Sequence, residues 1–214
     1  MPSGRVDLFE PLCRFHPYSC TEYDYSLDGE DLLGTRMHVA NCLDGEKAIL
    51  AGSWSIDDAA ARPFEWEAEV RRGAIFPLPR HWATSIGCGN IHPPTFSPAA
   101  LMVRDPGGFE WAALEGDDVF IPLRGKATID GVEARAALDG IDGGSAPRVT
   151  VSTTSTPAPH GPAARARLAS GDSFAWGSHI ARIVRIVEPQ GGSLGAVGWV
   201  TIALSEGGPP GGDP

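Results

Sequence analysis

A high density of turn-forming residues sets a strong limit on how this chain can fold. Its 214 residues include 27 glycines and 19 prolines, about a fifth of the sequence. Proline interrupts helices and glycine weakens them, so this composition disfavours long helices and favours short elements joined by turns. Asp-Gly pairs, which suit tight hairpin turns, recur at residues 28–29, 44–45, 130–131, 139–140 and 142–143.

Two of the Asp-Gly pairs have strand-like sequences on both sides. Residues 36–42 and 47–54 flank one pair, and residues 126–129 and 132–137 flank the other. Runs of β-branched and apolar residues on each side of a short turn are typical of β-hairpins. The sequence therefore predicts hairpins at these two positions.

A third hairpin is predicted near the end of the chain. Residues 178–187 are rich in isoleucine and valine, and residues 196–204 resume the pattern after a Gly-Gly-Ser turn. The isoleucines recur every third residue, a spacing that fits a helix or a strand, but β-branched richness favours a strand. We expect six residues of this hairpin to pack in the main core: Ile180, Ile183, Ile186, Trp199, Val200 and Ile202.

These patterns predict a mainly β protein, either an antiparallel β-sandwich or a distorted barrel, with few short helices. We expect residues 1–142 to form the main β body and residues 165–205 to form a β-hairpin unit packed on it. Residues 143–164 are rich in Gly, Ser, Thr and Pro, which predicts a linker or an edge strand between them. The tail, residues 206–214, is predicted to be disordered.

An internal similarity suggests that part of the β body arose by duplication. Residues 64–78 align without gaps to residues 109–123 with six identities in 15 positions. With one residue skipped, the match extends over residues 64–87 and 109–131. The structural interpretation is a duplicated β unit, and the alternative is coincidence promoted by biased composition.

The tryptophans are expected to pack in the core, because each lies in a strand-like stretch beside apolar residues. Exposure of some of them on a β surface, where they would bind sugar or peptide, is the alternative. The six are Trp54, Trp66, Trp82, Trp111, Trp176 and Trp199.

The N-terminal region contains a set of potential zinc ligands. Its cysteines and histidines are Cys13, His16, Cys20, His38 and Cys42. Zinc takes four nitrogen or sulfur ligands, and small sites are commonly built from two short ligand pairs. These spacings match no standard zinc motif, and a chain of this length can fold without a metal. We therefore expect no bound metal, with the five residues as the weak alternative.

Cys88 is the strongest candidate nucleophile. It lies between two glycines, which can present a thiol on a tight turn with backbone N–H groups nearby, and His92 follows four residues later. His81 and His179 are further candidate bases for an activated thiolate. The alternative is a half-buried thiol in a simple β-turn.

The charge of the chain limits its partners and its compartment. The net charge is −10, which weighs against nucleic acid or an anionic membrane as the main partner. Asp7 and Glu10 fall where the apolar core of a signal peptide would lie, and no apolar run approaches the ~18 residues of a transmembrane helix. We expect an acidic, cytoplasmic protein with reduced thiols.

The sequence contains no nucleotide-binding glycine motif, no zinc-protease motif and no serine-hydrolase motif, so no cofactor is expected. Of its 17 basic residues, 15 are arginine, which is typical of proteins from GC-rich bacterial genomes. The favoured function is that of a non-enzymatic protein–protein interaction or scaffold component with another protein as its partner. The alternative is a small cysteine-dependent hydrolase that uses Cys88 with a histidine.

Overall fold

Residues 23–27, 30–44, 47–56, 63–87, 100–104, 107–139, 146–155, 164–191 and 195–206 are described by the computed structural model, which gives side chains for most of them. These segments form strands β1 to β15 and one short 3₁₀ turn, η1 (Glu110–Ala112). The described residues contain no α-helix. The prediction of a mainly antiparallel β protein is therefore confirmed.

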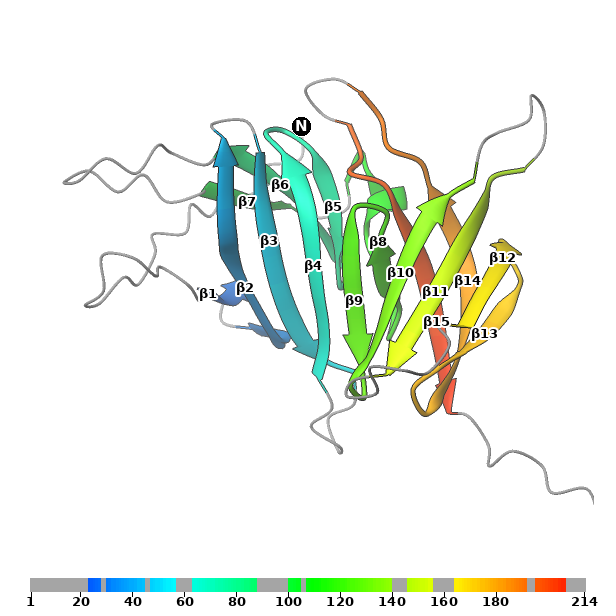
Figure 1. Cartoon of the computed structure of the whole chain (residues 1–214). Coiled ribbons are helices and arrows are strands. Elements are labelled where there is room, and N and C mark those ends of the chain that lie inside the picture. Colours follow the sequence, from blue (N-terminus) through cyan, green and yellow to red (C-terminus); the bar gives the residue numbers. More distant parts are fainter. Residues whose placement is uncertain are drawn as a thin grey trace, which may run out of the picture.

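One layer of the molecule is an eight-stranded sheet in which every neighbouring pair is antiparallel. In spatial order, its strands are β1 (Tyr23–Leu27), β2 (Glu30–Asp44), β3 (Lys47–Ser55), β4 (Pro63–Arg71), β9 (Gly125–Ile129), β10 (Val132–Leu138), β11 (Arg148–Ser155) and β12 (Ala164–Ala169). Two distant parts of the chain thus meet where β4 pairs with β9 (Figure 1).

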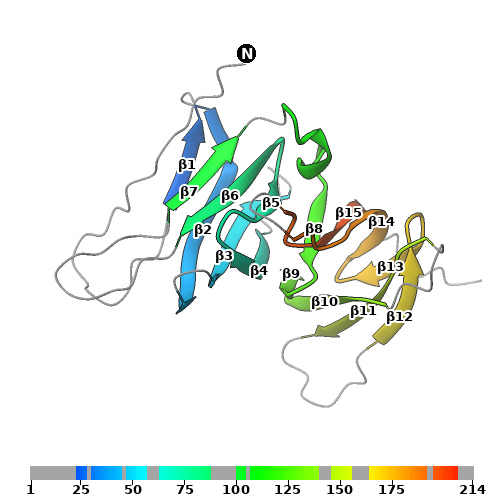
Figure 2. The same ribbon diagram turned by 90° about the horizontal axis from the view of Figure 1, so that it is seen from above.

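Two smaller antiparallel sheets form the second layer. One contains β5 (Ile75–Leu78), β6 (His81–Gly87) and β7 (Ala100–Arg104). The other contains, in spatial order, β13 (Ser173–Trp176), β14 (His179–Val187), β15 (Trp199–Glu206) and β8 (Val119–Pro122). Both lie against the same face of the large sheet (Figures 1 and 2). None of the three sheets closes on itself, so the architecture is that of a sandwich and not of a distorted barrel.

The hairpin at Asp130-Gly131 shows how local sequence sets a turn. Ile129 and Val132 are register partners, which leaves two residues in the turn. Both have positive φ, 51° at Asp130 and 71° at Gly131, the pattern of a type I′ turn that Asp-Gly favours. The predicted pairing of β2 with β3 across residues 45–46 is also confirmed.

The terminal hairpin is present, but one of its six expected core residues is misplaced. Ile183, Ile186, Trp199, Val200 and Ile202 are buried as predicted. The prediction for Ile180 is wrong, because 42% of this residue is exposed. Residues 180 and 183 are an odd number of positions apart, so strand alternation places Ile180 outward and Ile183 inward. The register of β14 against β15 shifts after Ile183, which brings Ile186 to the same buried face as Ile183. The regular spacing of the three isoleucines therefore spans an outward and an inward position.

Within residues 143–164, where the sequence predicts a linker or an edge strand, residues 148–155 form β11, which is an inner strand of the large sheet. β11 pairs with β10 on one side and with β12 on the other, so β12 occupies the edge. The alternating Ser and Thr residues of an inner strand with one solvated face resemble those of an edge strand, so the sequence pattern does not separate the two.

The two similar segments adopt different structures, so the duplication stays a hypothesis from the sequence. Residues 64–71 lie in β4, whereas residues 109–116 contain η1 and irregular backbone. β5 and β6 pair as a hairpin, whereas β8 and β9 belong to opposite layers.

The core between the layers is built around Phe120 of β8. Its ring centroid lies 5.3 Å from that of Trp66 and 6.0 Å from those of Trp54 and Phe64. These three aromatic residues come from β3 and β4 of the large sheet. Trp176 of β13 adds a T-shaped contact with Phe64 at 6.4 Å. The expectation that tryptophans pack in the core is confirmed for five of the six, and Trp111 is half-buried.

A second run of aromatic rings joins the two small sheets. Trp82 of β6 contacts Phe109, Phe109 contacts Trp111, and Trp111 stacks on Trp199 of β15 with centroids 5.9 Å apart. The segment that carries Phe109 and Trp111 therefore covers the outer side of the second layer.

We predict that Phe120→Ala destabilises the protein by about 3–5 kcal/mol, the range for removing a buried phenylalanine. The substitution removes the ring that contacts three aromatic residues of the opposite sheet, so the layers lose their shared contact. Urea unfolding followed by tryptophan fluorescence measures the change. Phe174→Ala, at a half-buried position of β13, is the matched control. An equal loss for both variants would contradict the central role of Phe120.

We further predict that a chain ending at residue 164 does not fold. It lacks β15, the strand that pairs with β8, and it lacks buried side chains worth ~1.5–3 kcal/mol each. Circular dichroism and sedimentation are expected to show an unfolded or aggregated fragment. A soluble fragment that melts cooperatively would instead show that residues 165–205 are a separate unit.

Candidate functional site

A pocket of about 820 Å³ opens at one end of the sandwich, between the β4–β5 turn and the β14–β15 connection. Figure 1 shows both segments at the upper edge of the molecule, where the connection is drawn in orange and red. The charged residues that line the pocket are Lys47 at the start of β3, Glu69 and Arg71 of β4, Arg72 of the β4–β5 turn, and Arg124 between β8 and β9.

A tight turn places the two consecutive arginines at the rim. The Ala74 N–H donates to the Arg71 carbonyl at 2.9 Å, so Arg72 and Gly73 are the central turn residues. Gly73 has a φ of 77°, a conformation that glycine adopts without penalty at the second central position of a type II turn. Arg71 and Arg72 are both exposed.

The opposite wall is fixed by backbone hydrogen bonds. Ile75 N–H donates to Gly195 O and Val197 N–H donates to Ile75 O, both at 2.9 Å. Gln190 N–H donates to Ala196 O at 3.0 Å, and this bond joins the two ends of the β14–β15 connection. A Cβ atom on Gly195 would lie 2.1 Å from the Gln190 carbonyl oxygen, so this close approach requires glycine.

The pocket carries a strong local charge. Four cations and one carboxylate line it, so its formal charge is +3 in a chain whose net charge is −10. Glu69 Oε1 lies 3.4 Å from Arg124 Nη1. Among the described residues, Lys47, Arg71 and Arg72 have no ion-pair partner. Asp44 is the register partner of Lys47 on β2, and its side chain lies outside the described part of the chain.

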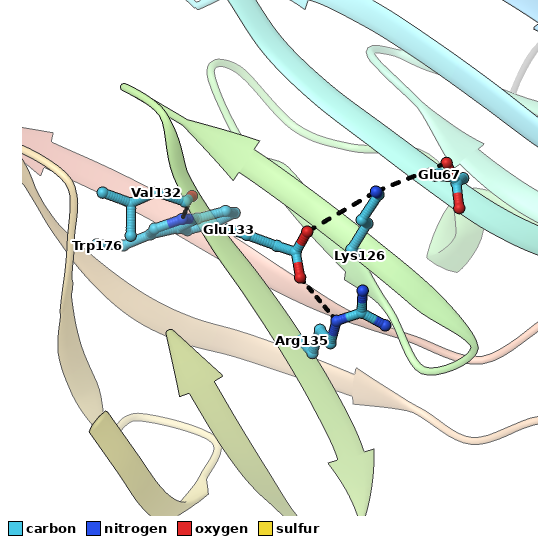
Figure 3. A network of polar contacts seen from close by, with 6 residues as sticks. All are labelled: Glu67, Lys126, Val132, Glu133, Arg135 and Trp176. Carbon is cyan, nitrogen blue, oxygen red and sulfur yellow. Dashed lines mark hydrogen bonds and ion pairs between the residues drawn. The ribbon is translucent and has the colours of Figure 1, made fainter. Parts of the chain in front are cut away.

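The outer face of the large sheet shows the contrasting arrangement. Lys126 Nζ lies 3.8 Å from Glu67 Oε2 and 3.7 Å from Glu133 Oε2, and Glu133 also pairs with Arg135 at 2.7 Å (Figure 3). Positive and negative side chains alternate there across β4, β9 and β10. Among the described residues, three of the four pocket cations, Lys47, Arg71 and Arg72, lack such a partner, which makes the pocket the candidate functional site.

A hydroxyl, an imidazole and a carboxylate also meet at the far ends of two hairpins. The Ser178 hydroxyl donates to Asp130 Oδ2 at 2.5 Å, and His179 Nδ1 lies 3.4 Å from Ser178 Oγ and 3.5 Å from Asp130 Oδ2. In hydrolase triads the imidazole lies between the other two groups, with one nitrogen toward each. Here the hydroxyl bonds directly to the carboxylate and one nitrogen faces both. The cluster therefore ties the β13–β14 turn to the β9–β10 turn.

The candidate catalytic residues are only partly covered by the structure. Cys88 and His92 lie outside the described residues, so catalysis at Cys88 stays a hypothesis. His81 opens β6, and its Nδ1 donates to the Pro79 carbonyl at 3.0 Å. That bond fixes the orientation of the imidazole ring.

The candidate zinc ligands Cys13, His16 and Cys20 also lie outside the described residues. His38 and Cys42 are on β2, opposite Ala51 and Ala48 of β3, with a register shift between them. Ala48 is buried and Ala51 lies on the other face, so the two β2 positions no longer share a face of the sheet. Within the described part of the chain, no group of three potential ligands converges on a metal site.

Sequence patterns do not identify the pocket residues as a site. The available signal was the Arg-Arg-Gly run at residues 71–73, but Lys47 and Arg124 lie far from it along the chain. Only the pairing of β3 with β4 and of β4 with β9 brings these residues together.

Comparisons with protein-family models, with curated proteins and with solved structures find no match to this chain. Across the described residues, no helix has the length and apolarity needed to cross a bilayer.

The Asp118 carboxyl, which precedes β8, has a perturbed pKa. Burial is the main cause and raises this pKa above its ordinary value. The Glu115 carboxylate raises the pKa further, as does Asp117 to a smaller extent, and Arg182 partly opposes them by lowering it. A raised folded-state pKa means that the folded protein binds the proton more tightly than the unfolded chain. Ionisation of Asp118 therefore lowers stability as the pH rises from the unfolded pKa through the folded pKa.

We predict that Asp118→Asn raises the melting temperature at neutral pH. The difference from the unmodified protein is expected to vanish at pH about 3, below the ordinary aspartate pKa of ~3.9, where the carboxyl is protonated in both states. Thermal melts at the two pH values test this. Glu110→Gln, at an exposed position of the same segment, controls for the change in net charge. An identical shift in melting temperature at both pH values would contradict the raised pKa of Asp118.

Proposed function

We propose that this protein is a non-enzymatic interaction protein that binds an acidic segment of a partner protein in the cationic pocket. The observation that carries the proposal is the formal charge of +3 on the pocket lining of a chain with net charge −10. Complementary charge selects and orients a partner, and it suppresses wrong partners more than it adds affinity.

The chemistry of the lining supports binding. Arg71, Arg72 and Arg124 supply positively charged guanidinium groups that can hold and orient an anion. Their guanidinium groups present paired N–H donors that match the two oxygens of a carboxylate.

The distribution of charge favours a protein partner over a polyanion. A long nucleic acid would meet the net charge of −10 outside the pocket, whereas a short acidic segment interacts mainly with the local lining. The cytoplasmic location expected from the sequence is part of this proposal.

Fluorescence anisotropy with two labelled peptides of equal length, one rich in glutamate and one in glutamine, tests the proposal. We expect the glutamate peptide to bind, with an affinity that falls as salt is added. The double variant Arg71→Gln/Arg72→Gln is expected to weaken binding about tenfold or more, because a hydrogen bond to a charged group is worth ~1.5–3 kcal/mol.

Arg165→Gln is the matched control. Arg165 is exposed on β12, at the far edge of the large sheet, and it is not among the residues that line the pocket. Equal binding of the two peptides, or an equal loss in the control variant, would overturn the proposal. Melting temperatures of all variants confirm that the substitutions leave the fold intact.

A further inference from the structure

Two cations of the pocket face each other across neighbouring strands. Lys47 of β3 and Arg71 of β4 are register partners, so their side chains leave the same face of the sheet side by side. Like charges in this position destabilise a sheet. Arg72 adds a third cation immediately after the strand. A bound anion would relieve this repulsion.

The charge to be compensated exceeds that of one carboxylate. The Glu69 carboxylate faces Arg124, which leaves Lys47, Arg71 and Arg72 without an ion-pair partner among the described residues. A carboxylate carries one negative charge on two oxygens. A phosphate monoester carries about −1.5 to −2 charges at neutral pH on three terminal oxygens, so it can accept hydrogen bonds from several cations at once.

The remaining lining agrees with a phosphate that is attached to a larger molecule. The wall opposite the arginines is built from Gln190, Gly191, Gly195 and Ala196, which carry no charge. The pocket volume of about 820 Å³ is much larger than one phosphate group, so residues on either side of the phosphate can enter with it.

We propose that the group recognised by this pocket is the phosphate monoester of a phosphorylated serine or threonine in the partner protein. This inference rests on the proposed function, because it names the anionic group of the segment that the pocket binds. Lys47, Arg71 and Arg72 bind the phosphate oxygens, and the uncharged wall contacts the flanking peptide.

Three labelled peptides of one sequence, with serine, glutamate or phosphoserine at the central position, test the inference by fluorescence anisotropy. We expect the phosphoserine peptide to bind at least about tenfold more tightly than the glutamate peptide, the step that 1.4 kcal/mol represents. Arg71→Gln and Arg72→Gln are each expected to abolish that preference, whereas Arg165→Gln retains it. Inorganic phosphate, compared with chloride at equal ionic strength, is expected to raise the melting temperature of the unmodified protein and not of the double variant.

The outcomes separate this inference from the proposed function. Equal affinities for the glutamate and phosphoserine peptides, both sensitive to Arg71→Gln, would overturn the phosphate inference and leave the proposed function standing. Failure of both peptides to bind would overturn both. A phosphoserine preference that survives in the double variant would place the phosphate elsewhere on the protein. Stronger competition by a short oligonucleotide or by vesicles of anionic lipid would assign the pocket to those ligands instead.

Discussion

The two layers of the sandwich are held together by contacts between Phe120 and aromatic side chains of the opposite sheet. Trp54, Phe64 and Trp66 reach Phe120 from two adjacent strands, so one ring of the second layer is held by both. Aromatic pairs in tilted or stacked geometry contribute more to stability than their buried area alone would give. Once these rings are buried, β8 has a fixed place under β4, and β15 pairs with β8.

The same packing decides where the pocket forms. The chain after β14 returns along β5, and its backbone is bonded to Ile75 on one side and, through Gly198, to Leu123 on the other. This segment joins the two small sheets and also supplies the uncharged wall of the pocket. The β4–β5 turn, which carries Arg71 and Arg72, lies across from it. The same stretch of backbone therefore connects the two small sheets and forms one wall of the proposed binding site.

The surface carries two kinds of charge arrangement with different consequences. Around Lys126, acids and bases alternate, and such exposed pairs contribute little to stability while keeping the face neutral. In the pocket, cations adjoin one another with only Glu69 among them. Repulsion between these cations lowers the stability of the free protein, and an anionic partner would relieve it. This difference between the two charge arrangements is the basis of the function proposed above.

Local sequence patterns are enough to predict three hairpins and most of the core of the terminal hairpin. These features are local: Asp130 and Gly131 set the turn by their φ angles, and alternation sets which residues face inward. Tertiary contacts set the inner position of β11, the register shift after Ile183 that buries Ile186, and the pairing of β4 with β9. It alone brought Lys47 and Arg124 to Arg71. Pairing between distant strands is selected by burial of the aromatic core and by backbone hydrogen bonds, and neither leaves a periodic signal in the sequence.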